Sequence, residues 1–260
     1  MTLVDANNAR FHVADSGGTG PAVLFLHGNL MDHTMWDGVV EALDGYRCIR
    51  FDFRLHGATV DDALPFTYWD AARDALAILG RLDVPGAHLV GNSQGGFTAL
   101  RTALLAPARV KTLTLIDTAA TAFPGEALRQ MAQIREGFAA GAVEETGTAV
   151  LGLLLGADQP STGHWLARLR QQPHRRLSTA VGVLMGADDI AGRLAEITMP
   201  ATVIHGAADL PIPSEAGTAL ASALPSAGAV RLLDGVAHTP PVTHTADTAD
   251  LLADFLRRSA

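Results

Sequence analysis

The chain has 260 residues, of which 48% are hydrophobic and 18% are charged, and its formal net charge at pH 7 is −8. This length and apolar content suffice for one large hydrophobic core, or for a core with an attached lid. The acidic residues are scattered, and the sequence has neither the basic footprint of a nucleic-acid-binding protein nor a polybasic membrane-binding segment. We therefore expect no nucleic-acid partner and no membrane partner.

Cysteine content and hydropathy exclude two further classes of protein. Cys48 is the only cysteine, so no disulfide framework can form within the chain. The first residues lack the basic start and long apolar run of a signal peptide, and no apolar run approaches the length of a membrane span. We expect a cytoplasmic protein, and no pattern in the sequence indicates its oligomeric state.

Short apolar runs alternate along the chain with longer segments of helical period. The opening stretch 9–18 alternates weakly and predicts an added edge strand. Strands separated by helices favour an α/β fold, in which a mostly parallel central sheet is covered by helices on both faces. The predicted buried strands are 22–27, 47–52, 87–91, 112–117, 201–206 and 229–235.

Two segments have clear signs of amphipathic helix. In 67–82, Thr67 and Asp70 have the spacing of a capping box. Segment 245–260 carries arginines near its C-terminus, where the helix dipole favours positive charge. The residues predicted to form the buried face of the first helix are Trp69, Ala72, Leu76, Leu79 and Leu82.

Residues 123–184 interrupt this alternation, because they contain no convincing strand. Stretches 125–141, 147–157 and 162–172 each indicate a short helix, and 172–189 leads back towards the sheet. A segment of this length is long for an ordinary crossover connection. We expect a helical cap, or lid, at 123–184, inserted into a core domain made of 1–122 and 185–260.

The motif G-x-S-x-G lies between a predicted strand and a predicted helix, at 91–95. In a nucleophile elbow, the serine occupies a strained turn that lifts its side chain above the sheet. Side chains at Gly91 and Gly95 would collide with neighbouring backbone, and Gly96 is expected to let the helix pack closely against a strand. Ser93 is therefore the predicted nucleophile, and the backbone N–H of Gln94 is predicted to stabilise an oxyanion beside it.

A serine nucleophile needs a histidine base that is oriented by an acid, and the elbow predicts both at the ends of later strands. Asp209 follows the strand at 201–206, and His238 follows the strand at 229–235. Asp117 is an alternative acid from an earlier strand, and His244 is a rival to His238. The remaining rivals, Asp188 and Asp189, are interpreted as helix caps.

A second oxyanion donor should come from the loop after the first buried strand. Gly28 is expected to permit a tight turn, so that the N–H of Asn29 points at the site. We interpret His27 and His205 as structural histidines bonded to nearby backbone, and Trp36 as core packing. The sequence has no metal-binding pattern, and we expect no metal and no cofactor.

Together these motifs resemble the α/β-hydrolase family over nearly the whole chain outside the predicted cap. "HGN" at 27–29 matches the oxyanion loop, "GNSQGG" at 91–96 the elbow, "GAADLPIP" at 206–213 the acid loop and "GVAHTPP" at 235–241 the histidine loop. Asp52, Arg54 and Gly57 match an Asp-x-Arg-Gly-x-Gly stretch, with Leu55 where the family usually has glycine. The resemblance implies a Ser-Asp-His hydrolase whose triad is Ser93, Asp209 and His238.

The resemblance implies hydrolysis of a carboxylic ester or lactone through an acyl-enzyme. Haloalkane dehalogenases and epoxide hydrolases of this fold use an aspartate nucleophile, which Ser93 excludes. Carbon–carbon bond hydrolases, cofactor-free haloperoxidases or perhydrolases, and a triad-retaining ligand sensor with slow turnover stay open as alternatives. Leucines in 151–155 and 165–169 suggest an apolar pocket roof, and the low aromatic content, 5%, suggests an aliphatic lining. We expect a small or medium apolar substrate.

Overall fold

A computed structural model describes residues 2–259 of the chain, and within them eight strands form one sheet in the order β1-β2-β4-β3-β5-β6-β7-β8. Strands β3 to β8 all run parallel to one another, whereas β1 and β2 are antiparallel to their neighbours. The fold class expected from the sequence is confirmed. The strands are β1 (Thr2–Ala6), β2 (Ala9–Asp15), β3 (Ala22–Leu26), β4 (Arg47–Phe51), β5 (Ala87–Asn92), β6 (Val110–Ile116), β7 (Ala201–Gly206) and β8 (Arg231–Leu233).

Helices cover both faces of the sheet and give it two hydrophobic clusters. Alternate residues of one strand enter different clusters: Leu24 and Leu26 face α2, α3 and α8, while Val23 and Phe25 face α1 and α10. The covering helices are α1 (Asp37–Glu41), α2 (Tyr68–Arg81), α3 (Gln94–Leu105), α8 (Ser214–Ala223), α9 (Pro240–Thr243) and α10 (Thr245–Arg258), with 3-10 turns at His33–Trp36, Pro107–Arg109 and Ala191–Glu196. No helix in residues 2–259 is long and apolar enough to cross a membrane.

The six predicted buried strands all occur, although β8 is only three residues long and its side chains are partly exposed. The predicted strand near the N-terminus is β2, but it is not at the edge of the sheet, because β1 pairs outside it. Asn7 and Asn8 connect the two strands with positive φ angles of 44° and 62°. Two such residues in a two-residue connection are typical of a hairpin turn.

Helix α2 begins at the predicted capping box, and it buries Ala72 and Leu79 as predicted, whereas Leu82 at its C-terminal end is only partly buried. The Thr67 side chain accepts from the N–H of Asp70, and the Asp70 carboxylate accepts from the N–H of Thr67. Trp69 and Leu76 are only partly buried, because they lie on the margin of the packed face. The buried side chains of the helix are Tyr68, Ala71, Ala72, Asp74, Ala75, Ile78 and Leu79.

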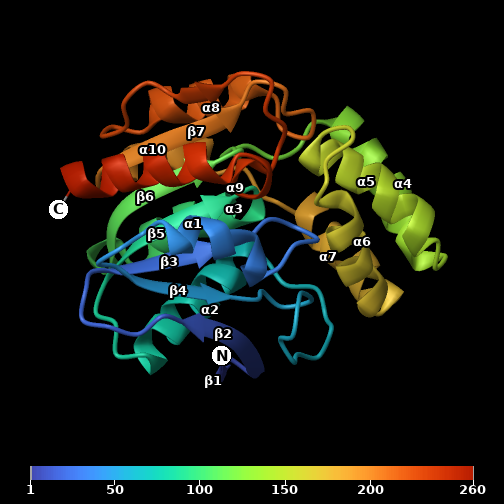
Figure 1. Ribbon diagram of the computed structural model, residues 1–260, viewed down its shortest axis with the longest axis horizontal. Coiled ribbons are helices and arrows are strands. Elements are labelled where there is room, and N and C mark those ends of the chain that lie inside the picture. Colours follow the sequence, from blue (N-terminus) through green and yellow to red (C-terminus); the bar gives the residue numbers. More distant parts are fainter. Residues whose placement is uncertain (1, 260) are drawn as a thin grey trace.

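Four helices lie between β6 and β7, and we refer to them as the four-helix segment: α4 (Gly125–Ala139), α5 (Val143–Leu155), α6 (Thr162–Gln171) and α7 (His174–Met185). They stand together beyond one end of the sheet, in green to gold in Figure 1. The first three correspond to the predicted short helices, and α7 forms where the sequence indicated only a return to the sheet. Among the described residues, none between β6 and β7 belongs to a strand.

Candidate active site

Ser93 occupies a sharp turn between β5 and α3. Its φ of 53° and ψ of −117° lie outside the regions that non-glycine residues favour, as a nucleophile elbow requires. A Cβ at Gly91 would lie 2.4 Å from the backbone of Gly95, and a Cβ at Gly95 would lie 2.0 Å from the carbonyl oxygen of Leu26. The turn therefore admits only glycine at both positions, for the steric reason expected from the sequence.

Two further glycines near the turn allow close approach of side chains. A Cβ at Gly96 would meet the side chain of Thr118 at 2.5 Å, so Gly96 itself faces the loop that follows β6. The close contact of helix α3 with a strand, β3, is made by Gly95 instead. A Cβ at Gly28 would lie 2.8 Å from Oδ1 of Asn92. Glycine at position 28 is needed for this close approach to Asn92 at the end of β5. The carbonyl oxygen of Gly28 also accepts from the N–H of Met31, so the chain turns tightly here, as the sequence predicted.

His238 and Asp209 form a buried pair, with His238 Nδ1 2.7 Å from Asp209 Oδ2. The N–H of Ile212 donates to Asp209 Oδ1 at 2.9 Å, so both oxygens of the carboxylate have partners. Burial alone would raise the pKa of Asp209, but the charge of His238, followed by hydrogen bonds from His205 and His238, holds that pKa below its ordinary value. The carboxylate is therefore ionised and orients the imidazole.

The rival acids and the rival base have other partners. Asp117 Oδ1 accepts from the N–H of Gly206, and His244 Nδ1 lies 3.0 Å from Oγ1 of Thr243. Asp189 accepts from the N–H of Ala191, but the residue at the N-cap of that 3-10 turn is Ile190, so Asp189 is not the cap that the sequence suggested. Asp188 is not a cap, because it forms an ion pair with Arg101 and accepts from Trp69.

Two backbone N–H groups are available beside Ser93. Gln94 is the first residue of α3, so its N–H has no partner within the helix. The N–H of Asn29 donates to no other described residue. The Asn29 side chain connects the loop after β3 to two helices. Its Nδ2 donates to Gln94 Oε1 in α3 and to the carbonyl oxygen of Ala180 in α7, both at 3.1 Å.

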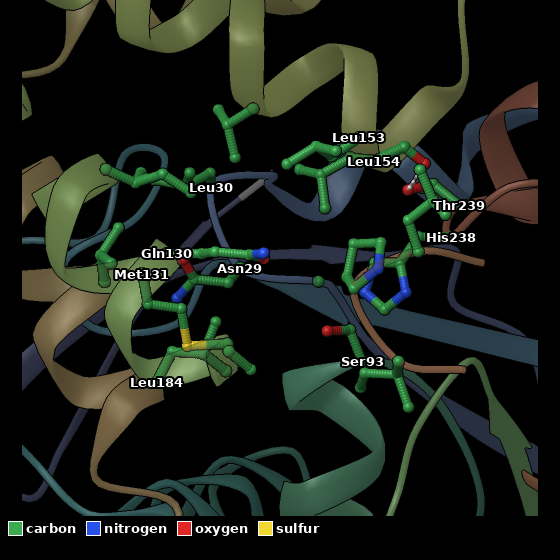
Figure 2. Close-up of a pocket in the computed structure, with 18 of the residues that line it drawn as sticks. Asn29, Leu30, Ser93, Gln130, Met131, Leu153, Leu154, Leu184, His238 and Thr239 are labelled. Carbon is green, nitrogen blue, oxygen red and sulfur yellow. Dashed lines mark hydrogen bonds between the residues drawn. The ribbon is translucent and has the colours of Figure 1, made fainter. Parts of the chain in front are cut away.

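Ser93 and His238 line the same cavity, which has a volume of about 110 Å³. Figure 2 shows Ser93 below the His238 ring, with its hydroxyl oxygen directed into the cavity. No hydrogen bond joins the hydroxyl to His238 in the structure of residues 2–259, so the Ser93 side chain would have to turn towards the imidazole before the two could exchange a proton. Catalytic hydrogen bonds are often long in structures without a ligand.

The cavity wall opposite Ser93 comes from the four-helix segment, and it is mostly aliphatic. Leu153 and Leu154 of α5 line it, as the sequence predicted (Figure 2). The prediction for 165–169 is wrong, because Trp165, Leu166 and Leu169 of α6 pack inside a hydrophobic cluster instead. Residues of α4 and α7 were missed, although the apolar face of each helix was a signal: Ala127, Gln130, Met131 and Ile134, and Val181 and Leu184.

The other histidines near the site are structural, in agreement with the sequence. His27 donates from Nδ1 to the carbonyl oxygen of Gly28 and accepts at Nε2 from the N–H of Phe53, and burial lowers its pKa. His205 Nε2 lies 2.8 Å from the carbonyl oxygen of Ile212. Trp36 is fully buried and packs on Phe25, with ring centroids 5.2 Å apart.

Two clusters of possible metal ligands occur within residues 2–259: His12, His33 and Asp52, and Asp117, His205 and Asp209. In the first cluster, Asp52 accepts from the ring and the backbone N–H of His33, and also from the N–H of Ala58. These bonds fix the loop that carries Arg54, which pairs with Asp74. The groups of the first cluster are therefore held together by hydrogen bonds within the protein. The second cluster contains Asp209, which is the hydrogen-bond partner of His238.

Comparisons with known proteins agree with this fold. The family model of the alpha/beta hydrolase fold matches residues 21–245. A pimeloyl-[acyl-carrier protein] methyl ester esterase from Chromobacterium violaceum is 34% identical, over 94% of this chain and 97% of that protein. 3-Oxoadipate enol-lactonase 1 from Acinetobacter baylyi is 30% identical, over 73% of this chain and 71% of that protein.

Solved structures show the same fold at lower sequence identity. An enol-lactonase from Burkholderia xenovorans LB400 superposes with a TM-score of 0.89 and 23% identity, over 98% of this chain and 99% of that one. The order of motifs, the elbow and the match across residues 21–245 lead to one conclusion: the chain belongs to the α/β-hydrolase family.

Proposed function

We propose that this chain hydrolyses carboxylic esters or lactones through an acyl-enzyme on Ser93, with Asp209 and His238 completing the triad. One observation carries the proposal: an elbow serine and a histidine held at 2.7 Å by a buried carboxylate open on the same cavity. The esterases and enol-lactonases among the relatives support this reaction class. The reaction needs no cofactor and no metal, because the serine, the histidine and two N–H groups supply its chemistry.

The first half of the reaction acylates Ser93. His238 takes the hydroxyl proton at Nε2 while Ser93 Oγ attacks the carbonyl carbon, and Asp209 stabilises the resulting imidazolium. The N–H groups of Asn29 and Gln94 hold the oxyanion of the tetrahedral intermediate. When that intermediate collapses, the bond to the alcohol oxygen breaks and the proton passes from His238 to the leaving alcohol.

The second half regenerates the enzyme. A water gives its proton to His238 as it attacks the acyl carbon, and the tetrahedral intermediate then releases the acid and returns the proton to Ser93. For a lactone, the leaving alcohol stays attached to the acyl group, so one hydroxy acid is released. Loss of one oxyanion donor typically costs about 3 kcal/mol of transition-state stabilisation.

The cavity favours a neutral, mainly aliphatic substrate. Among the described residues, its lining includes no arginine, lysine, aspartate or glutamate, and Phe123 is its one residue of the phenylalanine, tyrosine and tryptophan type. A charged group brought into such a lining would lose hydration without gaining a partner. We assign the role of cap to residues 123–184, and the role of core domain to 1–122 and 185–260, because α4, α5 and α7 provide the wall opposite Ser93.

The uncharged lining favours one of the two substrate types that the relatives' names indicate, a neutral ester, over the other, a lactone that carries a carboxylate. An enol-lactone of 3-oxoadipate keeps one free carboxylate, and the lining offers no cation to pair with it. A methyl ester is neutral at the reacting end. We therefore expect neutral butyrate and hexanoate esters to be better substrates than an ester whose acyl group ends in a carboxylate, by about tenfold or more in kcat/KM.

Ser93→Ala tests the proposal with p-nitrophenyl butyrate. We expect kcat/KM to fall by about 10⁴-fold or more, because the covalent route is lost. Ser222→Ala is the matched control, since Ser222 is exposed on α8 and its hydroxyl bonds only to the backbone of Thr218. A Ser93→Ala variant as active as the Ser222→Ala variant would refute the assignment of the nucleophile.

The number of turnovers separates an enzyme from a ligand sensor that keeps its triad. We expect at least hundreds of p-nitrophenolate molecules released per chain at constant rate, because the proposed base and oxyanion donors would serve deacylation as well as acylation. One molecule released per chain, followed by a stable acyl adduct, would support the sensor instead.

A further inference from the structure

A second buried carboxyl group lies beside the acid of the proposed triad. Asp117 follows the last residue of β6, its φ is 46°, and its N–H donates to the carbonyl oxygen of Ile204 in β7. Its side chain is fully buried. One oxygen each from Asp117 and Asp209, and a ring nitrogen of His205, all lie within 4.8 Å of one another.

The two carboxyl groups differ in the number of donors that they receive. Asp209 Oδ1 accepts from Ile212 N–H, and its Oδ2 faces Nδ1 of His238 at 2.7 Å and Nε2 of His205 at 3.2 Å. Asp117 Oδ1 accepts from Gly206 N–H at 2.8 Å, while no residue of 2–259 donates to its buried Oδ2. Asp209 is therefore equipped to hold a negative charge, and Asp117 is not.

His205 does not supply a compensating positive charge. Its Nε2 faces only acceptors, which are the carbonyl oxygen of Ile212, Asp209 and, at 3.7 Å, Asp117 Oδ1. Its Nδ1 is buried without a partner, and a Cβ at Gly217 would lie 2.3 Å from it. A proton on Nδ1 would have no acceptor, so the ring is neutral and carries its proton on Nε2.

We propose that Asp117 keeps its proton in the folded protein at neutral pH and donates it from Oδ2 to the carboxylate of Asp209. With this proton, Asp117 Oδ2 gains a hydrogen-bond partner. The carboxylate of Asp209 gains a carboxyl O–H donor in addition to the backbone N–H of Ile212 and the two histidine rings. Asp117 is thus a positioning residue: it acts on the reaction through Asp209, which in turn orients His238. This role rests on the proposed function, whereas the protonation state does not.

The surroundings of the pair agree with a single shared negative charge. Burial raises the pKa of Asp117 well above its ordinary value, and the charge of Asp209 raises it further, against the hydrogen bond from Gly206. The titratable groups that face the pair are His205 from β7 and His238 from the loop after β8. The neighbours of these histidines are uncharged: Asn92 of β5 donates to the carbonyl oxygen of His238, and Gly217 of α8 lies beside the ring of His205.

Asp117→Asn is the informative variant, because an amide can accept from Gly206 N–H and donate to Asp209 without any charge. If Asp117 is protonated, the variant preserves the charge around His238, and the acidic limb of the pH profile of kcat/KM stays within about 0.3 pH unit of the parent. If Asp117 is ionised, the variant removes a negative charge near His238, and the limb moves to lower pH by about one unit or more. That movement would overturn the proposal.

Asp117→Ala removes the donor altogether. We expect kcat to fall by about 10- to 100-fold with KM little changed, because the carboxylate loses a hydrogen bond and Asp209 is less well held. Recovery of kcat in Asp117→Asn identifies the donor as the cause. An Asn variant as impaired as the Ala variant would contradict the positioning role. If the Ala variant does not fold, the kcat of the Asn variant is compared with that of the parent, and a loss of about 10- to 100-fold in the Asn variant would contradict the role in the same way.

Unfolding as a function of pH tests the protonation state without any activity. An ordinary aspartate in the unfolded chain loses its proton above about pH 4. If folded Asp117 keeps that proton, the parent unfolds more readily as pH rises, while Asp117→Asn has no such proton to lose. The ratio of the unfolding equilibrium constants, parent over variant, should then rise up to tenfold per pH unit between about pH 5 and 7.

A ratio that stays constant over this range would show that Asp117 is ionised in the folded protein and would overturn the proposal. The urea titrations require no substrate, so they distinguish this failure from failure of the proposed function. A rising ratio in a protein that does not hydrolyse esters would support the buried proton and reject only its catalytic role.

Discussion

The loops at the carboxyl ends of the strands and the four-helix segment face one another across the cavity, but they are built under different constraints. In the elbow, a Cβ added at Gly91 or Gly95 would lie within 2.4 Å of backbone atoms. In the four-helix segment, an added Cβ would meet only side chains, at 2.3 Å for Gly137 and 2.8 Å for Gly147, and no atom within 4 Å at Gly152 or Gly163. Sterics therefore fix residue identity on the catalytic side, whereas the opposite wall needs mainly an apolar surface of suitable volume.

The largest effect is expected on the catalytic side, at Asp209→Asn. The amide cannot stabilise the imidazolium of His238 and favours the wrong tautomer, so kcat should fall by about 10⁴-fold. Steady-state kinetics with p-nitrophenyl butyrate measure this fall, and circular dichroism checks that the fold is kept. A loss below tenfold would mean that another acid, with Asp117 the nearest, supports the imidazole.

A glycine exchange in each region compares their steric freedom directly. Gly95→Ala should destabilise the protein by about 3 kcal/mol, because its Cβ would lie 2.0 Å from the carbonyl oxygen of Leu26. Gly152→Ala, on an exposed helix position, should stabilise it by about 1 kcal/mol, because alanine favours the helix. Urea unfolding measures both free energies of unfolding, and equal effects of the two variants would remove the contrast between the regions.

A smaller effect is expected from Leu154→Ala, which enlarges the cavity wall on α5. The ratio of kcat/KM for octanoate over butyrate esters should rise by about tenfold, because the longer acyl chain fills the vacated volume. Leu166→Ala is the control, since this leucine is buried in α6 and does not line the cavity. The interpretation of the wall would be wrong if the control changed chain-length preference as much as Leu154→Ala.

The same contrast explains how much the sequence could predict. The elbow and the loops of Asp209 and His238 carry short patterns in a fixed order, because strand ends and tight turns constrain each position. The structure brings Ser93, His238 and Asp209 to one end of the sheet, as the order of motifs predicts. The wall was predicted only in part, because the apolar face of a short helix does not say whether it meets a cavity or another helix.

Two differences between sequence and structure, and one departure from the family pattern, have identifiable physical causes. Strand β1 was missed because it is short and three of its five side chains are exposed, although Asn7 and Asn8 gave a turn signal. Helix α2 buries Ala72 and Leu79 as predicted, but Ala75 and Ile78 extend its buried face on the side away from Leu76. Leu55 replaces the family's glycine yet adopts a φ of 67°, and its side chain is buried, so packing offsets the backbone strain.

The most direct measurement of the central claim is labelling with diethyl p-nitrophenyl phosphate, which reacts with an activated serine. The account predicts one diethylphosphoryl group per chain, on the peptide that contains Ser93, together with loss of esterase activity at the same rate. Labelling should be absent in Ser93→Ala and far slower in His238→Ala. Loss of activity accompanied by label on a different residue, or full activity with Ser93 labelled, would contradict the account.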